Sequence, residues 1–262
     1  MAASGSGLAE MDLSVIIVLA VAGFAGGLIN ALAGGGTLVT FPALIGIGLP
    51  LKLANTTSQV ALWPGRLTSV MAQLRDLKML GAKAWVSLAV GLVGGFAGAQ
   101  LLIVMDPKIF RALVPWLLLC ATLVFAMSPT ITRWLLARGR GRGSPMMQVL
   151  GRLMEFAFSI YGGFFGAGLG VFLLAGYAIA GIEDVKQTNV LKNMMGMVIT
   201  TTSALTFILR GEVIWSAALP MLIGALAGGF AGGTLARVIP AAALRLVVTV
   251  GALFLTAWYF VT

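Results

Sequence analysis

Long apolar runs separated by short polar stretches cover almost the whole chain. The runs occupy residues 12–33, 37–50, 53–73, 84–105, 109–130, 149–167, 171–182, 187–209, 213–236 and 241–262. Apolar runs of about 20 residues are typical of helices that cross a bilayer. The second and seventh runs are shorter, and as helices they would span roughly 20 Å of a hydrocarbon layer roughly 30 Å thick. The pattern predicts an all-α membrane protein with two groups of about five helices, each containing one short or broken helix shielded from lipid by its neighbours.

The end of the first run resembles the cleavage site of a signal peptide, because it reads Ala31, Leu32, Ala33. A signal peptide also needs a positively charged segment before its apolar run. Here Glu10 and Asp12 precede the run, and no Lys or Arg does. We therefore expect a retained helix.

The two groups of runs share one register, 134 residues apart. This shift pairs Gly34 with Gly168, Gly36 with Gly170, Lys52 with Lys186, Asn55 with Asn189, the run 94–98 with 228–232, and Arg111 with Arg245. An apolar composition produces chance matches of Leu and Ala, but not matched Lys, Asn and Arg in one frame. The register predicts a first repeat at 1–132, a basic linker at 133–148 and a second repeat at 149–262.

An odd number of crossings per repeat would make the repeats inverted. With the N-terminus outside, eleven Lys and Arg residues fall in inside loops and four in outside loops, as the positive-inside rule requires. The segment 133–152 alone carries five arginines, so we expect it to be cytoplasmic. The alternative has four crossings per repeat with re-entrant short helices, which makes the repeats parallel and places loops 75–83 and 210–212 on one side.

The composition agrees with a multi-pass protein of the inner (plasma) membrane. Residues of the AVILMFWYC group make up 60% of the chain, charged residues make up 10%, and the mean hydropathy is +1.04. Soluble domains are less apolar and carry about 25% charged residues. The net charge of +9 does not indicate nucleic-acid binding, because the basic residues punctuate apolar runs. The chain has no His and one Cys, so we expect no metal, no cofactor and no enzymatic acid–base pair.

Glycine-rich breaks come before both short helices. The first break is Gly34, Gly35 and Gly36 followed by Thr37, and the second contains Gly168 and Gly170. A helix that starts at such a break points its positive N-terminal end into the protein, where it can hold an anion. The alternative is that these glycines only allow close helix packing.

Polar residues gather in the helix after each break. In the first repeat they are Asn55, Thr56, Gln59, Trp63 and Arg66, and in the second they are Asn189, Lys192 and Asn193. Polar and charged groups within membrane spans are costly unless they line a cavity or find partners. We therefore expect these residues to bind an anionic substrate. The alternative is that Arg66 and Lys192 pair with an acid or reach the membrane interface.

Glu155 is the sole acidic residue well inside a predicted span. It is the candidate for proton coupling, because no other acid of the spans could carry a proton across. It also follows Arg152 by three residues, so an interfacial ion pair within one helix is the alternative.

These motifs, in this order, resemble the TauE/SafE sulfite exporter (TSUP) family. The resemblance rests on the first break with Phe41 and Pro42 after it, on NTTSQVALWPG at 55–65, on KQTNVLKN at 186–193 and on GGFAG at 228–232. It implies a bacterial inner-membrane carrier with duplicated halves that moves sulfur-containing anions such as sulfite or organosulfonates, usually outward. The chain departs from doubled symmetry, because Ser58 stands where the second half has Lys192 and Leu169 replaces a third glycine.

The residues and the resemblance together predict a secondary transporter, most simply an exporter, that works by alternating access at a site between the repeats. Its partners would be a small anion and the lipid bilayer, with a homo-oligomer left open. The alternatives are an anion channel, a carrier for another small organic anion, and a structural membrane subunit without transport activity.

Overall fold

The apolar runs form helices in the computed structural model, which describes residues 12–71, 81–138, 145–179, 185–235, 246, 248–254 and 256–257. The helices are α1 (Leu13–Ala33), α2 (Thr37–Gly46), α3 (Leu51–Met71), α4 (Ala82–Val104), α5 (Pro107–Arg138), α6 (Pro145–Phe164), α7 (Leu169–Ile179), α8 (Val185–Leu209) and α9 (Trp215–Leu235). Residues 246 and 248–254 are helical as well. Within the described ranges there is no strand, so the prediction of an all-α fold is confirmed.

The helix ends follow local sequence signals. Pro107 and Pro145 open α5 and α6, at the first helical position, where the missing N–H of proline costs nothing. Asp106 precedes α5, and its carboxylate accepts a 2.7 Å hydrogen bond from the N–H of Lys108. Helices α5 and α6 extend into both ends of the predicted linker at 133–148. Its residues 139–144, the predicted outside segment 1–11 and the loop arginine and lysine at 75 and 78 lie outside the described residues.

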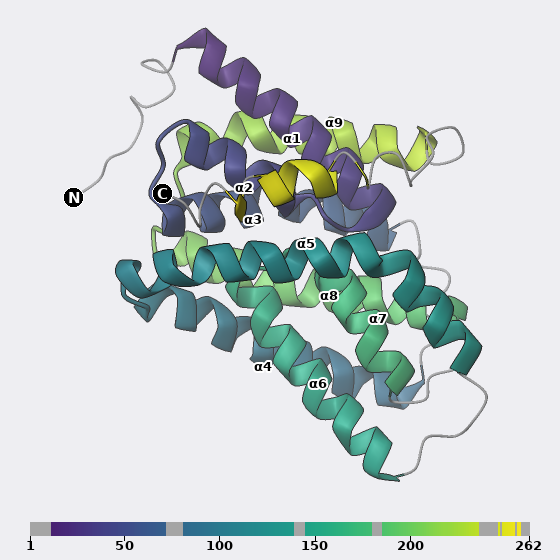
Figure 1. The fold of residues 1–262 in the computed structure, drawn as a ribbon. Coiled ribbons are helices and arrows are strands. Elements are labelled where there is room, and N and C mark those ends of the chain that lie inside the picture. The colour runs from purple at the N-terminus through teal and green to yellow at the C-terminus, as the bar shows by residue number, and fades with distance from the viewer. Residues whose placement is uncertain are drawn as a thin grey trace.

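Two flanking helix pairs join the halves of the chain. Helix α1 packs along α9, and α4 packs along α6, while α3 and α8 contact each other between these pairs (Figure 1). The backbones meet at glycines. A Cβ atom at Gly27 would stand 2.1 Å from the carbonyl oxygen of Ala225, and one at Gly98 would stand 2.0 Å from that of Ile160. Small residues therefore allow close helix contact here, as in other membrane proteins.

The glycine contacts reveal a register that differs from the ungapped one. A Cβ atom at Gly228 would contact the carbonyl oxygen of Phe24, and one at Gly94 would likewise contact the carbonyl oxygen of Phe156. The glycines are 134 residues apart, but the phenylalanines are 132 apart. The ends of α1 and α6 agree with the smaller shift, because the N–H groups at 34 and 166 each bond to a carbonyl five residues earlier. The first break therefore matches Gly166 rather than Gly168. The two extra residues lie between the starts of α7 and α8, which are 16 residues apart, whereas α2 and α3 start 14 apart.

The short helices fold back against the helices that precede them. In the first half, a Cβ atom at Gly36 would stand 2.4 Å from the carbonyl oxygen of Gly26. In the second half, the rings of Phe158 on α6 and Phe172 on α7 lie 5.2 Å apart. Each break is thus the tip of a hairpin made of one long and one short helix.

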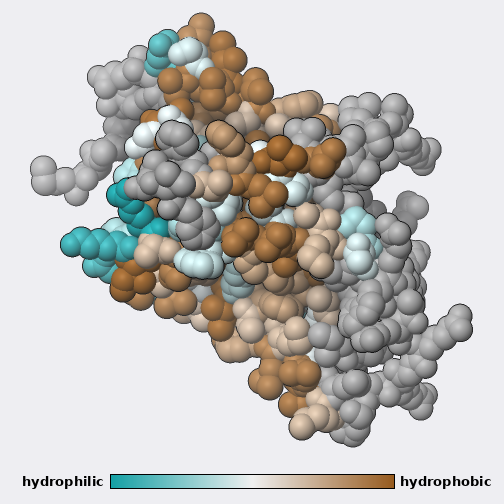
Figure 2. All heavy atoms as spheres, viewed as in Figure 1, coloured by the Kyte–Doolittle hydropathy of each residue, from teal (hydrophilic) through white to brown (hydrophobic). Residues whose placement is uncertain are grey.

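The outer surface is apolar and suits a lipid environment. Figure 2 shows hydrophobic side chains over much of the coloured part of the visible face, with hydrophilic residues gathered at the end that holds the α4–α5 turn. Helices α1, α4, α5 and α9 contain stretches that are long and apolar enough to cross a membrane. Helices α3 and α8 contribute buried polar residues, and the other helices surround them. The structure therefore has the form of a multi-pass membrane protein with a polar central pair of helices.

Candidate anion-binding site

The first break is explained by chain geometry and packing. Gly34 has a φ of +77° and closes α1, a conformation that favours glycine. A Cβ atom at Gly35 would stand 2.5 Å from the ring of Phe125. Gly36 likewise packs against α1. Thr37, the first residue of α2, is buried. The predicted role of this break in anion binding has no further support from its contacts.

The second break leaves more room. Gly166 and Gly168 have φ values of +76° and +71°. The nearest atom to a Cβ placed at Gly168 is the carbonyl oxygen of Ala121, at 3.6 Å. Helix α7 starts here, and the first N–H groups of a helix have no acceptor within it. Here the N–H groups of Leu169 and Val171 bond to the carbonyl oxygens of Gly166 and Gly168, so this helix end attracts an anion mainly through its partial positive charge.

Lys192 of α8 passes beside the start of α7. Its Cδ atom lies 3.6 Å from the Cβ position at Gly170. Side chain and helix end thus come together from two different elements, α8 and α7. A lysine does not stabilise a helix N-terminus, because both are positive. An anion between them would stabilise both.

Arg66 of α3 brings a second full positive charge to this place. Its Nη1 atom lies 2.9 Å from the Cβ position at Gly196, one turn after Lys192 on α8. Among the described residues, Glu155 forms an ion pair with Arg152, at 2.6 Å. Glu155 therefore does not pair with Arg66, and two cations and a helix N-terminus share one interior region.

The amides of α3 lie around the end of α6 instead. The Nδ2 group of Asn55 donates a 2.8 Å hydrogen bond to the carbonyl oxygen of Phe164, and Nε2 of Gln59 donates to the same oxygen at 3.4 Å. Gln59 Oε1 also accepts a 3.4 Å bond from Ser203 of α8. These amides satisfy a carbonyl that the broken helix leaves free. Their amide nitrogens thus bond to the protein, while Oδ1 of Asn55 is buried without a hydrogen-bond partner. The predicted role of these residues in substrate binding stays a prediction.

The remaining candidates have separate locations. Thr56 donates its hydroxyl to the carbonyl oxygen of Glu212 in the α8–α9 turn. The indole N–H of Trp63 donates a 2.9 Å bond to Thr201 on α8. Asn193 is partly buried, next to Lys192 on α8. Asn189 lies in α8, but its side chain is outside the described residues.

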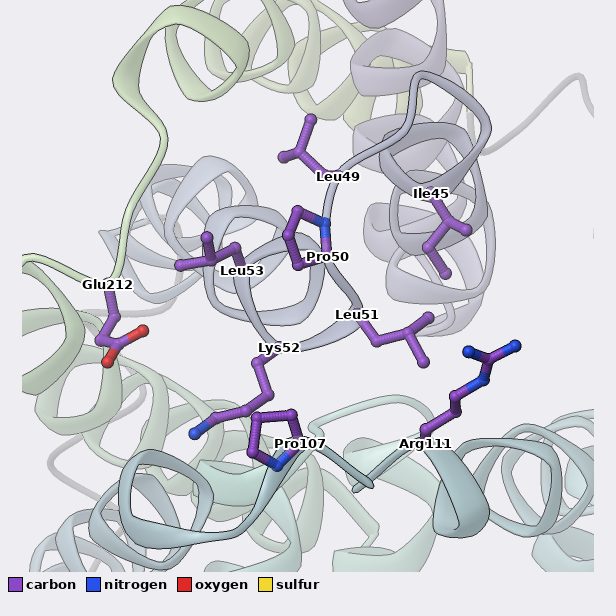
Figure 3. Close-up of a pocket in the computed structure, with 9 residues that line it drawn as sticks. All are labelled: Ile45, Leu49, Pro50, Leu51, Lys52, Leu53, Pro107, Arg111 and Glu212. Atoms are coloured by element: carbon purple, nitrogen blue, oxygen red, sulfur yellow. The ribbon is translucent and has the colours of Figure 1, made fainter. Parts of the chain in front are cut away.

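A basic cavity opens at one end of the bundle. It has a volume of about 580 Å³ and is lined by Ile45, Leu49, Pro50, Leu51, Lys52, Leu53, Pro107, Arg111 and Glu212 (Figure 3). The ammonium group of Lys52 donates to the carbonyl oxygens of Ile103 and Met105, at 2.8 and 3.0 Å. Arg111 is exposed. In the sequence Lys52 and Arg111 were only loop charges, because nothing along the chain indicates that the starts of α3 and α5 meet.

The α8–α9 turn covers the polar start of α3 below this cavity. Besides the Thr56 bond, the N–H of Ile214 donates a 3.1 Å bond to the hydroxyl of Thr57. Asn55 and Gln59 behind these contacts are 0 and 5% exposed. In this conformation the amides are closed off from the cavity.

Comparisons with known proteins agree with this architecture. The family profile described as "Sulfite exporter TauE/SafE" matches residues 19–259. A "Probable membrane transporter protein" of Haemophilus influenzae is 26% identical over 250 residues, covering 95% of both chains. The "Probable membrane transporter protein YfcA" of Escherichia coli K12 is 30% identical over 216 residues, covering 80% of this chain and 76% of its own. The "Probable membrane transporter protein ORF9" of a Sinorhizobium species is 26% identical over 225 residues, covering 85 and 84%.

Proposed function

The chain belongs to the sulfite exporter TauE/SafE family, and from this membership we propose that it is a secondary transporter that moves a small sulfur-containing anion, such as sulfite or an organosulfonate, out of the cell. The names of the family and of its relatives point to membrane transport rather than to catalysis. The substrate class comes from the family description, and the residues of the interior support it.

The cluster of Arg66, Lys192 and the start of α7 carries the proposal. Arg66 follows Lys52, at the cavity, by 14 residues along α3, which is a rise of about 21 Å. Arg66 is also five residues, about 7.5 Å, from the end of α3, and Arg66 and Lys192 are both partly buried. The cations therefore lie inside the bundle toward the end of α3, where charge is costly and is a mark of substrate paths. A sulfonate or sulfite group presents several oxygens with one or two negative charges. It can accept hydrogen bonds from a guanidinium and an ammonium together, and the positive end of α7 attracts it.

The bonds of the α8–α9 turn favour a carrier that alternates between open states over a channel. A channel needs a continuous polar pore. Here Thr56 and Thr57 bond to the turn, and Asn55 and Gln59 behind these contacts are closed off from the cavity. Release of these two contacts would open a path from that end, so they form the outer closure of our proposed cycle.

Two features support inverted repeats. First, α1 of the first half is equivalent to α6 of the second, and α4 is equivalent to α9, so the α1–α9 contact in one half has its counterpart in the α4–α6 contact. In addition, Lys52 bonds to the end of α4 and Thr56 to the α8–α9 turn, at one end of the bundle. The end of α3 and the start of α4 then lie at the opposite end from loop 210–212, as five crossings per repeat require. We propose an inner-membrane location with the basic linker in the cytoplasm and the cavity outside.

Replacement of Lys192 by Ala tests this function. Purified protein would be heated with sulfite, sulfate, methanesulfonate or acetate, and anion flux would be followed in liposomes. The wild-type protein should be stabilised by sulfite or methanesulfonate and should transport it. Loss of a charged hydrogen-bond donor costs about 1.5–3 kcal/mol, or roughly 10- to 100-fold in affinity, so Lys192→Ala should bind that anion correspondingly less tightly.

Lys108→Ala is the matched control, because Lys108 is an exposed lysine at the start of α5. It should retain wild-type affinity and flux. Equal affinity in Lys192→Ala and wild type would show that the site lies elsewhere. A wild-type protein that transports none of the four anions would contradict the proposed function.

A further inference from the structure

A group of buried oxygen atoms lies at the C-terminal end of α6, where the second break begins. A Cβ atom at Gly166 would stand 3.0 Å from the carbonyl oxygen of Gly162 and 3.5 Å from Oε1 of Gln59 on α3. Both glycines are buried, and Gln59 is 5% exposed. Oxygens from two different helices therefore converge on one buried point beside Gly166.

The carbonyl oxygen of Gly162 lacks its regular helical donor. In a continued helix it would accept the N–H of the residue four positions later, Gly166. Instead, the N–H groups of Phe165 and Gly166 both bond to the carbonyl oxygen of Tyr161, at 2.8 and 3.1 Å. The left-handed turn at Gly166 thus frees the oxygen of Gly162, which belongs to the partially negative end of the helix.

The amide oxygen of Gln59 has a weak donor. The hydroxyl of Ser203 on α8 lies 3.4 Å from it and 3.2 Å from the carbonyl oxygen of Thr200. A hydroxyl has one proton to donate, and the shorter contact is the one with Thr200. With its proton there, Ser203 presents a lone pair to Gln59. A third oxygen, which is also buried, then joins the group.

Asn55 shows that acceptors outnumber donors at this helix end. Its Nδ2 group donates to the carbonyl oxygen of Phe164. The Oδ1 atom of the same amide is buried without a hydrogen-bond partner. Acceptor oxygens are costly to bury without a donor. A bound cation compensates several such oxygens at once.

The equivalent turn of the first half does not gather oxygens. Gly34 ends α1 with a φ of +77°, as Gly166 ends α6 with +76°. A Cβ atom at Gly34 would meet nothing within 4 Å. The left-handed turn therefore does not by itself require oxygens around it. The group at Gly166 is a property of the second break alone.

The oxygen types indicate a monovalent cation. Oxygen ligands suit hard cations, and Ca²⁺ and Mg²⁺ sites usually include carboxylates. The oxygens beside Gly166 come from a backbone carbonyl, an amide and a hydroxyl. In secondary transporters, the C-terminal ends and free carbonyls of broken helices coordinate Na⁺, while N-terminal ends hold the anionic substrate. Such a site uses no His or Cys, so the composition of the chain gives no sign of it.

We propose that Na⁺ binds at the end of α6, to the carbonyl oxygen of Gly162, Oε1 of Gln59 and the hydroxyl of Ser203, and that Na⁺ and the transported anion promote each other's binding; this inference rests on the proposed transport function. The break at 165–168 separates this site from the start of α7, so the two opposite charges attract each other across it. Arg66 follows Gln59 by seven residues, about 10 Å along α3. Its charge opposes Na⁺ until an anion compensates it. By linkage, each ion raises the affinity for the other by the same factor.

The first measurement needs no substrate and no variant. The unfolding midpoint of the full-length protein in detergent would be compared in sodium, potassium and N-methyl-D-glucamine gluconate at equal ionic strength. Na⁺ should raise the midpoint in a saturable way, and K⁺ should raise it less. Equal midpoints in the three salts would mean that the oxygens bind water alone, and would overturn the proposal. An equal rise with K⁺ would overturn the assignment to Na⁺.

Variants of Gln59 locate the effect. Gln59→Met removes the amide oxygen at similar length and should lose the Na⁺-induced rise, whereas Gln59→Glu keeps an oxygen and should retain it. Gln100→Met is the matched control, because Gln100 is a partly buried glutamine of α4. It should respond to Na⁺ as the wild type does. A wild-type rise in Gln59→Met would show that Na⁺ binds elsewhere.

The second measurement tests coupling with methanesulfonate or sulfite as probe. Na⁺ in place of N-methyl-D-glucamine should raise anion affinity about tenfold, within the 5- to 150-fold range of coupled sites. It should also speed anion exchange in liposomes with equal solutions on both sides. Anion affinity of Gln59→Met should be the same in both salts. Equal affinity and exchange of the wild type in both salts would overturn coupling and leave anion transport established. A Na⁺-induced rise in a protein that binds neither anion would contradict the proposed function and the coupling, but not the Na⁺ site.

Discussion

The guanidinium group of Arg66 lies against Gly196, so that a Cβ atom added at Gly196 would stand 2.9 Å from Nη1. Gly196 comes one turn after Lys192 on α8. The missing side chain leaves the space that Arg66 occupies, and it thereby brings cations of α3 and α8 together. Gly196 thus contributes to the proposed anion site because its missing side chain leaves space for the guanidinium of Arg66.

Gly196→Ala should weaken anion binding while the protein keeps its fold. The added methyl group meets the end of a flexible side chain rather than backbone, so the guanidinium moves and the helices do not. Displacement of one charged donor should lower affinity roughly tenfold, measured by equilibrium binding of sulfite or methanesulfonate. Gly229→Ala is the control, because a Cβ there meets nothing within 4 Å. Wild-type affinity in Gly196→Ala would remove Arg66 from the site.

Gly98→Ala should instead destabilise the protein. Its Cβ would stand 2.0 Å from the carbonyl oxygen of Ile160, and backbone cannot move aside as a side chain does. Overpacking of this kind costs about 1–3 kcal/mol or more, which would appear as a lower thermal unfolding midpoint in detergent. Gly229→Ala serves again as control and should unfold no earlier than wild type. An unchanged midpoint in Gly98→Ala would mean that α4 and α6 are not in backbone contact.

Asn55→Leu should lower stability more than it lowers anion affinity. The change removes the 2.8 Å bond to the carbonyl oxygen of Phe164 and leaves that buried oxygen with the weaker bond from Gln59. Loss of such a partner costs about 1–3 kcal/mol. The unfolding midpoint without ligand should fall, and the further rise caused by a saturating anion should stay near that of wild type. A selective loss of the ligand-induced rise would place Asn55 in the binding site.

Arg111→Gln should slow transport at low salt. Arg111 lines the basic cavity without an ion pair among the described residues (Figure 3), so its charge is free to attract anions to the mouth. Such steering weakens with ionic strength, because salt screens charges beyond about 10 Å at 0.1 M. Initial flux should therefore fall a few-fold at low salt and match wild type at high salt. A larger effect from Arg210→Gln, which is exposed outside the cavity lining, would contradict this role.

The positions of the helices and the polar character of α3 and α8 could be predicted from the sequence, because apolar runs and polar clusters are local features of the chain. The exact pairing of the breaks was not. In the second half the glycines Gly166, Gly168 and Gly170 are two residues apart, so Gly34 can be aligned with any of them. The backbone hydrogen bonds at the ends of α1 and α6 show that Gly166 is its equivalent. The sequence shows where these glycines are, but it does not show which of them adopts a left-handed backbone conformation and which only allows close packing.

The partners of the polar residues were harder to predict than their presence. The i, i+3 spacing of Arg152 and Glu155 already contained their ion pair as one of two interpretations. The bonds of Asn55 and Gln59 to the end of α6 could not be predicted, because a broken helix end, which also needs hydrogen-bond donors, cannot be located before the fold is known.

The pairing of α1 with α9 also affects how the protein is made. About 180 residues separate the end of α1 from the start of α9. At 5–20 residues per second, a ribosome needs roughly 10–40 s to synthesise that stretch. During this time α1 lies in the bilayer with its glycine-lined face uncovered, because α9 has not yet been synthesised. Insertion of α9 therefore completes the packing of α1, and a chain released before that point would leave this glycine-lined face of the α1–α2 hairpin uncovered.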